Sequence, residues 1–315
     1  QQPLNEAKEM LLAQVTVVKT SQDKRLNKKT NHDNQSKTNA NKISINGYFN
    51  EVTITEKDGM RTIESNGIPD HAVGDFPNAY NPISIIPIDH TYKMMLTPTA
   101  LATPITALFY EFGVAVNGVP MDPNGPFYID GDERRAIQFP FVGLASGWQY
   151  EGLSKDVKLG MDQNNAHVQP PGVYHYHGYI TLFVQKRTEA TKAGQMVLLG
   201  YAADGFPIYS NMGHSDPANV NSSLVKLKSS YKLKSGARPA NPSDKPTGPT
   251  GDYNGKFVQD YRFENGSGDL DECNGRFGAT SEYPQGIYYY VISEDWPYIP
   301  RLFKGTPHES FKIGG

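Results

Sequence analysis

The sequence predicts a mainly β protein, sandwich- or barrel-like, with long loops and few short helices. Three observations carry this prediction. The 315 residues include 19 tyrosines, 30 glycines and 23 prolines, a composition typical of short strands joined by turns. Several runs of β-branched and aromatic residues are only four to seven residues long and are bounded by turn residues. Finally, one turn-and-strand unit occurs twice, and we expect the domain to be built around it.

The chain divides near residue 43. Residues 19–42 consist almost entirely of Lys, Asn, Thr, Gln and Ser, which predicts a polar linker without a core. We therefore assign residues 1–42 to an N-terminal extension and polar linker, and residues 43–315 to one large β domain. The extension is a candidate for self-association. A first residue that is Gln, not Met, is typical of a processed chain, so we expect a secreted protein, extracellular or periplasmic.

Turn signals place the expected strands. Asp58-Gly59 lies between two β-branched runs and predicts a hairpin over 52–63, and Asn117-Gly118 predicts another over 108–119. The stretch 66–82 is a long loop that contains Asp70 and His71, and it is either functional or a surface loop with one solvated histidine. Further strands are expected over 83–96, 136–142, 173–184, 196–202, 257–263 and 287–292, and a short helix over 187–194.

Charge and composition exclude some classes of partner. The net charge is −3 and positive residues are not concentrated on the main body, so we do not expect a nucleic-acid partner. No apolar run approaches eighteen residues, so we expect no membrane span. The single cysteine, Cys273, permits no internal disulfide and is interpreted as a small buried apolar residue.

Three of the eight histidines fall within eleven residues. In a strand, side chains alternate between faces, so His175 and His177 point to one side and Tyr174 and Tyr176 point to the other. A turn-rich segment precedes the strand and can fold His167 back over this pair. Imidazole is a ligand for zinc, copper, nickel and iron. The pattern predicts a metal site at His167, His175 and His177; the alternative is a strand that buries its tyrosines and leaves two histidines half exposed.

A turn-then-strand pattern is repeated. The first copy begins at Asp162 and runs through a Pro-Gly pair into Tyr174-His175-Tyr176-His177. The second begins at Asp271 and runs into Tyr288-Tyr289-Tyr290, with a spacer that is longer by five residues. Each Asp has an Asn three residues later, and such residues hold turns by bonding their own backbone. In this alignment His167 corresponds to Arg276, His175 to Tyr289 and His177 to Val291. We interpret the pattern as a duplicated unit.

These residues suggest a chemistry. A divalent ion, zinc or copper, held by three histidines with an open fourth position lowers the pKa of bound water and polarises a substrate oxygen. Candidate general bases are Asp204, Asp271 and Glu272, while Arg276 is a candidate for binding an anionic group. Copper would permit a redox reaction instead. Asp204 has a second interpretation, since an Asp at the end of a strand also caps a turn.

Several motifs resemble those of the YHYH-domain family of secreted proteins. They are Tyr174–His177, the segment Asp204–Tyr209, the segment Leu270–Arg276, and, nearer the N-terminus, Asn66–His71 and Phe76–Asn78. The similarity extends from about Ile43 to about Pro307. It implies no established activity. The resemblance also implies a second cysteine after the Pro-Tyr-Ile-Pro segment, where this chain has Leu302, and a histidine where this chain has Tyr289.

The sequence therefore favours a secreted metal-binding protein, with metal-dependent hydrolysis of an extracellular glycan or ester as the expected activity. Two alternatives stay open. The many tyrosines, asparagines and aspartates also suit a non-catalytic carbohydrate-binding protein, in which the histidines form a structural cluster. An extracellular structural or adhesive protein, joined to neighbours through residues 1–42, is the third interpretation. The expected partner is accordingly an extracellular small molecule or glycan.

Overall fold

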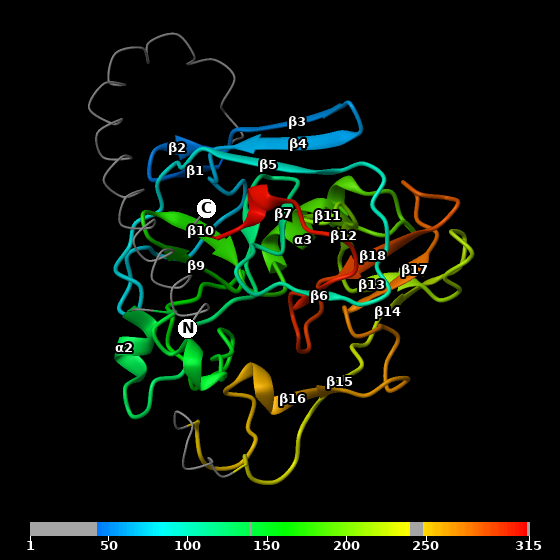
Figure 1. The fold of residues 1–315 in the computed structure, drawn as a ribbon. Helices are drawn as coiled ribbons and strands as arrows, with labels where there is room; N and C mark the ends of the chain where they lie inside the picture. The colour runs from blue at the N-terminus through cyan, green and yellow to red at the C-terminus, as the bar shows by residue number, and fades with distance from the viewer. Residues whose placement is uncertain (1–42, 139, 240–247, 314–315) are drawn as a thin grey trace.

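An open sheet of eight strands is the centre of the fold (Figure 1). The structure, a computed structural model, describes residues 43–138, 140–239 and 248–313. The strand order is β17-β18-β12-β11-β7-β8-β10-β9, so β17 and β9 are edges and the sheet does not close into a barrel. The bounds are β7 (Gly113–Ala115), β8 (Pro120–Met121), β9 (Ala166–Gln169), β10 (Val173–Tyr176), β11 (Leu198–Ala202), β12 (Pro207–Tyr209), β17 (Gly275–Gly278) and β18 (Ile287–Val291).

The two halves of this sheet have the same pattern of pairing. In one half the hairpin of β7 and β8 is followed by the hairpin of β9 and β10, and β8 pairs with β10 in parallel. In the other half the hairpin of β11 and β12 is followed by that of β17 and β18, and β12 pairs with β18 in parallel. Antiparallel pairing of β7 with β11 joins the halves. The arrangement of pairings therefore has two-fold symmetry, with its axis between β7 and β11.

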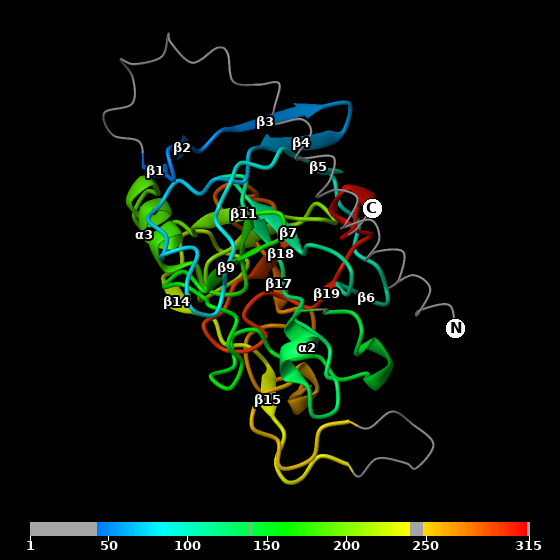
Figure 2. The same cartoon turned by 90° about the vertical axis from the view of Figure 1, so that its left-hand side faces the viewer.

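Smaller sheets lie around the large one. A three-stranded sheet lies at one end of the molecule and the hairpin of β15 and β16 at the other (Figures 1 and 2). The first consists of β3 (Val52–Lys57), β4 (Met60–Ser65) and β5 (His90–Met95), and Asp58-Gly59 makes the predicted turn. The remaining pairs are β1 (Ser44–Ile45) with β2 (Tyr48–Phe49), β6 (Ile105–Thr106) with β19 (Leu302–Phe303), β13 (Met212–His214) with β14 (Leu224–Lys226), and β15 (Tyr231–Leu233) with β16 (Tyr261–Phe263).

The prediction that the strand continues from His177 to residue 184 is wrong. β10 ends at Tyr176, and helix α3 (Thr181–Ala190) begins instead. The run is rich in β-branched and aromatic residues, but Ile180, Phe183 and Val184 have helical spacing and all three are buried. The predicted helix over 187–194 is accordingly the end of α3, whose last residue precedes Gly194 by four positions.

Three other predicted strands also differ. Of the strand expected over 83–96, only β5 (His90–Met95) forms. Residues 133–138 form the short helix α2 (Glu133–Gln138) where a strand over 136–142 was expected. Asp132 caps this helix by accepting a hydrogen bond from the backbone N–H of Arg135, 3.0 Å away. The strand expected over 257–263 begins as a 3₁₀ turn, η2 (Val258–Asp260), and only β16 follows. The other 3₁₀ turns are η1 (Leu144–Ser146) and η3 (Glu309–Phe311).

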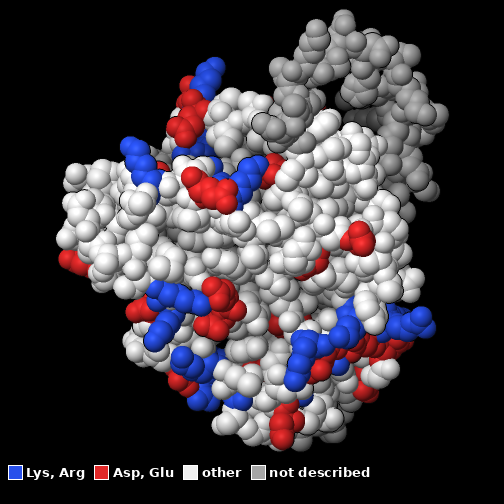
Figure 3. Space-filling model, turned by 180° about the vertical axis from the view of Figure 1, so that it is seen from behind, with Lys and Arg blue, Asp and Glu red and all other residues white. Residues whose placement is uncertain are grey.

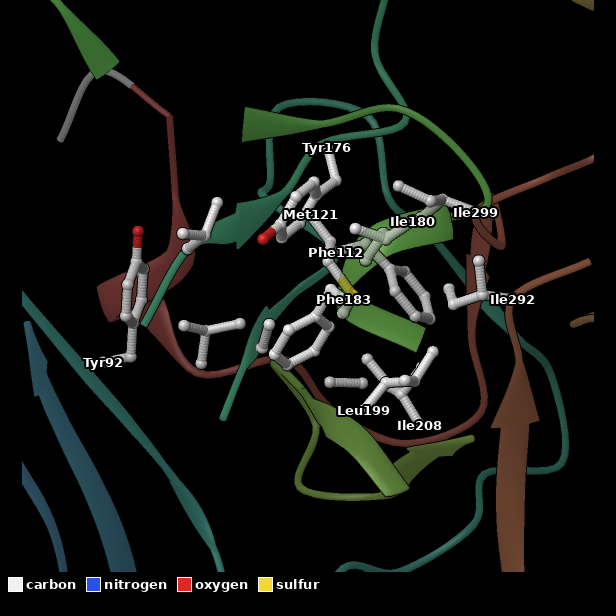
Figure 4. Close-up of a cluster of buried hydrophobic side chains, with 14 of the residues drawn as sticks. Tyr92, Phe112, Met121, Tyr176, Ile180, Phe183, Leu199, Ile208, Ile292 and Ile299 are labelled. Atoms are coloured by element: carbon white, nitrogen blue, oxygen red, sulfur yellow. The ribbon is translucent and has the colours of Figure 1, made fainter. Parts of the chain in front are cut away.

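One large apolar core packs on the face of the sheet that carries Tyr176 and Met121 (Figure 4). Phe183 from α3 and Phe112 lie in it, and Phe112 stacks on Phe303 with ring centroids 5.0 Å apart. A second, smaller core contains Tyr209, Leu227, Leu270, Tyr289 and Val291. β12 and β18 thus contribute to both cores through alternate side chains: Ile208 and Tyr290 lie in the large core, and Tyr209 and Tyr289 in the smaller one.

The mainly β class is confirmed. The predicted extension and linker, residues 1–42, lies outside the described residues. Within the described ranges no helix is long and apolar enough to span a membrane. Acidic and basic side chains are interspersed on the face seen in Figure 3, which is mostly uncharged.

Candidate metal centre

Strand β10 buries both of its faces. His175 is 1% exposed and His177 3% exposed, and Tyr174 and Tyr176 are fully buried on the other side. The interpretation that leaves the two histidines half exposed is therefore wrong. Buried imidazoles require polar partners. What those partners are decides the nature of the cluster.

The three predicted histidines converge. His167 on β9 is the direct cross-strand partner of His175 on β10, and His177 follows one residue after the end of that strand. The ring centroids of His167 lie 4.6 Å from His175 and 4.9 Å from His177, and one ligand nitrogen from each ring lies within 4.8 Å of the others. In the described parts of the chain, no other group of three or more potential metal-ligating side chains lies this close together.

Backbone carbonyls select the tautomer of two of the rings. Nδ1 of His167 lies 2.9 Å from the carbonyl oxygen of Leu159, and Nδ1 of His175 lies 3.2 Å from that of Val173. A carbonyl only accepts, so these nitrogens carry the hydrogen and each Nε2 keeps its lone pair. Nε2 of His175 lies 2.9 Å from Nε2 of His177. An ion bound by both nitrogens at about 2.0 Å holds them about 3.3 Å apart, so a small opening of the pair admits it.

Burial keeps the three rings neutral. It lowers the pKa of His167 to about 4 and those of His175 and His177 well below the usual value. The neighbouring histidines and the charge of Arg301 lower the pKa of His177 further. Neutral imidazole is the form that binds metal. Since Nε2 of His175 keeps its lone pair, the hydrogen of the contact between the two Nε2 atoms lies on His177, and it moves to Nδ1 of that ring when Nε2 becomes a ligand.

A tight turn brings His167 to the cluster. The carboxylate of Asp162 accepts hydrogen bonds from the backbone N–H groups of Asn164 and Ala166 and, at 2.7 Å, from the hydroxyl of Tyr174. Asn165 has a φ of 53°, a left-handed conformation that Asn tolerates, and its carbonyl accepts from the N–H of His177 at 2.7 Å. The same turn therefore fixes both ends of the histidine hairpin.

Gly152 lies close against the ring of His177. A Cβ added at this position would lie 3.2 Å from Nδ1 of His177. The next residue back, Glu151, is buried and accepts hydrogen bonds from Nε1 of Trp296 and from Arg301. The segment around Gly152 thus closes the cluster on the side of His177.

The second predicted copy makes the matching contacts. Asp271 accepts from the backbone N–H groups of Cys273 and Gly275 and from the hydroxyl of Tyr288. Arg276 and Tyr289 are direct cross-strand partners, and Nε of Arg276 donates to the hydroxyl of Tyr289 at 2.6 Å. Arg276 and Tyr289 thus pair with each other, as His167 and His175 do. The sequence alignment matched these two residues to the two histidines.

None of the four predicted catalytic side chains bonds to a histidine of the cluster. Asp271 holds its turn, and Arg276 donates to the hydroxyl of Tyr289 and to the carbonyl of His214. Asp204 accepts from the backbone N–H groups of Phe206 and Gly305 and from the hydroxyl of Tyr290. Glu272 is exposed, and its carbonyl accepts from Tyr231. Asp204 therefore caps its turn, and roles of these residues in catalysis stay predictions.

Tyr176 points away from the histidine cluster into a separate polar network. Its hydroxyl lies 2.7 Å from Nε2 of His71 and accepts from Nδ2 of Asn117 at 2.9 Å. Asn117 also donates to Asp70, which forms an ion pair with Lys186 at 2.6 Å. A cavity of about 860 Å³ lies at this network and is lined by Asp70, His71 and Lys186 among others. His71 is 2% exposed, so the interpretation of a solvated loop histidine is wrong.

Sequence reasoning missed the groups that come to β10 from distant segments. Asn117 and Asp122 flank β8, which pairs with β10. One signal was present. The stretch Val114-Ala-Val-Asn117-Gly-Val-Pro-Met121 resembles Tyr201-Ala-Ala-Asp204-Gly-Phe-Pro-Ile208, and the strand pairings match these two stretches residue by residue.

Comparison with known families identifies the chain. No curated protein and no solved structure matches it. A family model described as YHYH protein matches residues 91–305, more than half of the chain, and this range includes the histidine cluster and both hairpins described above. The segment Asn66–His71 lies before the matched range. The chain therefore belongs to the YHYH protein family.

Proposed function

We propose that this protein binds a zinc or copper ion through Nε2 of His167, His175 and His177. One observation carries the proposal: three neutral imidazoles converge, His175 and His177 buried and His167 half-buried, and carbonyl oxygens hold two of them in the tautomer that binds metal. Three ligands leave a fourth coordination position for water or substrate. A structural zinc site, in contrast, has four protein ligands.

The activity that this site supports best is hydrolysis. A zinc ion at three histidines lowers the pKa of bound water toward neutrality and provides a nucleophile. His175 and His177 are buried, and neither the cavity of about 860 Å³ nor a second one of about 290 Å³ is lined by the histidines of the cluster. Burial favours a small ester over a polysaccharide chain as substrate.

The sugar-binding alternative has less support. It predicts an exposed strip of aromatic rings, but Tyr231, Tyr261 and Trp296 pack on one another, with the last two rings stacked at 4.5 Å. Trp296 is 7% exposed and donates to Glu151. These rings stabilise the region around β15 and β16 and do not form an open platform.

Elemental analysis of protein purified without an affinity tag tests the proposal. The parent protein is compared with a His175→Ala/His177→Ala variant and with Tyr289→Phe, a control at the position that matches His175. We expect close to one ion per chain in the parent and the control, and none in the double variant. No metal in any of the three, after incubation with zinc and with copper, contradicts the proposal. The element found selects ester hydrolysis or redox assays.

A further inference from the structure

Asp122 is a buried carboxylate that directly follows β8, and His177 directly follows β10. β8 and β10 pair in parallel with Met121 opposite Tyr176, and the N–H of Asp122 donates to the carbonyl of Tyr176 at 2.9 Å. One position further along both strands, Asp122 comes beside His177. Since side chains alternate, Tyr176 and Met121 face the large core while Asp122 and His177 face the other side.

The second half of the sheet shows what this face holds when it carries no histidines. There Tyr209 pairs with Val291, and the ring of Tyr209 lies 5.4 Å from that of Tyr289. Both rings and Val291 belong to the smaller apolar core. The matching positions of the first half are Asp122, His175 and His177. Thus the same backbone carries an apolar core in one half and a carboxylate with imidazoles in the other.

The carboxylate of Asp122 is only partly bonded. Oδ1 accepts from the backbone N–H and from Nδ2 of Asn124, at 2.8 and 2.9 Å, and these are the hydrogen bonds of this side chain. Asp122 is 4% exposed, and its charge is opposed by burial, which raises its pKa to about 6. The positive charge of Arg301 acts on both Asp122 and His177.

We infer that Asp122 belongs to the same site as the three histidines and supplies a negative charge beside the bound ion, an inference that rests on the proposed metal site. Asp122 is not within ligand distance of the whole cluster, so it acts as a positioning residue. A neighbouring carboxylate strengthens the binding of a cation and accepts hydrogen bonds from its water.

The test is the affinity for zinc, measured by competition with a chromogenic chelator, together with the melting temperature of the metal-free protein. We expect Asp122→Asn to weaken zinc binding by about 10–100-fold, while the metal-free protein melts at the same or a higher temperature because a buried charge is gone. A residue with a purely structural role would lower both.

Asp204→Asn is the matched control. Asp204 is also buried, burial also raises its pKa to about 6, and the matching residue of the first half is already an asparagine, Asn117. We expect this variant to bind zinc as tightly as the parent. Asp122→Ser, which still accepts from the N–H of Asn124, repeats the test should the Asn variant not fold.

Unchanged affinity in both Asp122 variants, or an equal loss in Asp204→Asn, overturns the inference and leaves the histidine site intact. A parent protein that binds no zinc overturns the proposed function and this inference with it.

Discussion

His167 lies directly opposite His175 across the hairpin of β9 and β10. Their side chains therefore project from the same face, at a separation fixed by backbone hydrogen bonds. His177 joins them from just beyond the strand. Because the rigid hairpin holds two of the three rings, the proposed metal site needs little ordering. This relationship leads to the predictions that follow.

Acid destabilises the metal-free protein through the cluster. The histidines have lowered pKa values in the folded state, about 4 for His167, so the unfolded chain takes up more protons as pH falls below about 6.5. The contribution of these histidines to the free energy of unfolding is complete above that pH. It is lost at up to about 1.4 kcal/mol per histidine per pH unit as pH falls toward 4. Urea unfolding at several pH values, with chelator present, measures the slope. A His175→Gln/His177→Gln variant is expected to have a shallower slope, and an equal one would show that the rings are not neutral in the fold.

The turn aspartates have the same structural role but different functional consequences. Asp162→Ala and Asp271→Ala each remove two bonds to turn N–H groups and one to a tyrosine hydroxyl, and Asp162→Ala also removes a bond from the N–H of Gly74. Each is expected to cost roughly 2–4 kcal/mol. Only the Asp162 variant should also lose metal affinity, because its turn positions His167. Chemical unfolding and zinc titration of both variants check this. Equal affinities would mean that the turn does not position the ligand.

Gly152→Ala is expected to disturb the site selectively. The new methyl group would press on Nδ1 of His177 at 3.2 Å, so that ring must shift by a few tenths of an ångström. We expect zinc binding to weaken by about tenfold while far-ultraviolet circular dichroism stays the same. If this variant binds zinc as tightly as the parent, the side chain of His177 does not lie against residue 152.

Tyr176→Phe tests the alternation of faces. The hydroxyl bonds His71 and Asn117, on the side opposite to His175. The variant should lose roughly 1–2 kcal/mol of stability and keep its full metal content. Tyr290→Phe is its counterpart in the other half and leaves Asp204 without its tyrosine donor. Loss of metal from Tyr176→Phe would argue that the network at His71 and the histidine cluster are coupled.

Local patterns were sufficient for part of this fold and site. The period of two along Tyr174–His177 predicted which side chains share a face, and the turn at Asn117-Gly118 is where two strands meet. The helix α3 was missed because its first turn is made of β-branched and aromatic residues, and its apolar spacing was hidden in a continuous apolar run. Asp122 was missed for another reason: a parallel pair joins segments more than fifty residues apart, and no local pattern reports such a contact.

The matching halves of the sheet make this protein its own reference molecule. In a typical enzyme the effect of a site on the surrounding scaffold is judged against a distant homologue, with many other changes between them. Here a second hairpin of the same register, in the same chain and solvent, carries Tyr209, Tyr289 and Val291 in place of the ionisable groups. Transplanting those three side chains into the first half yields a variant without the proposed site, against which the effect of Asp122, His175 and His177 on stability is measured directly.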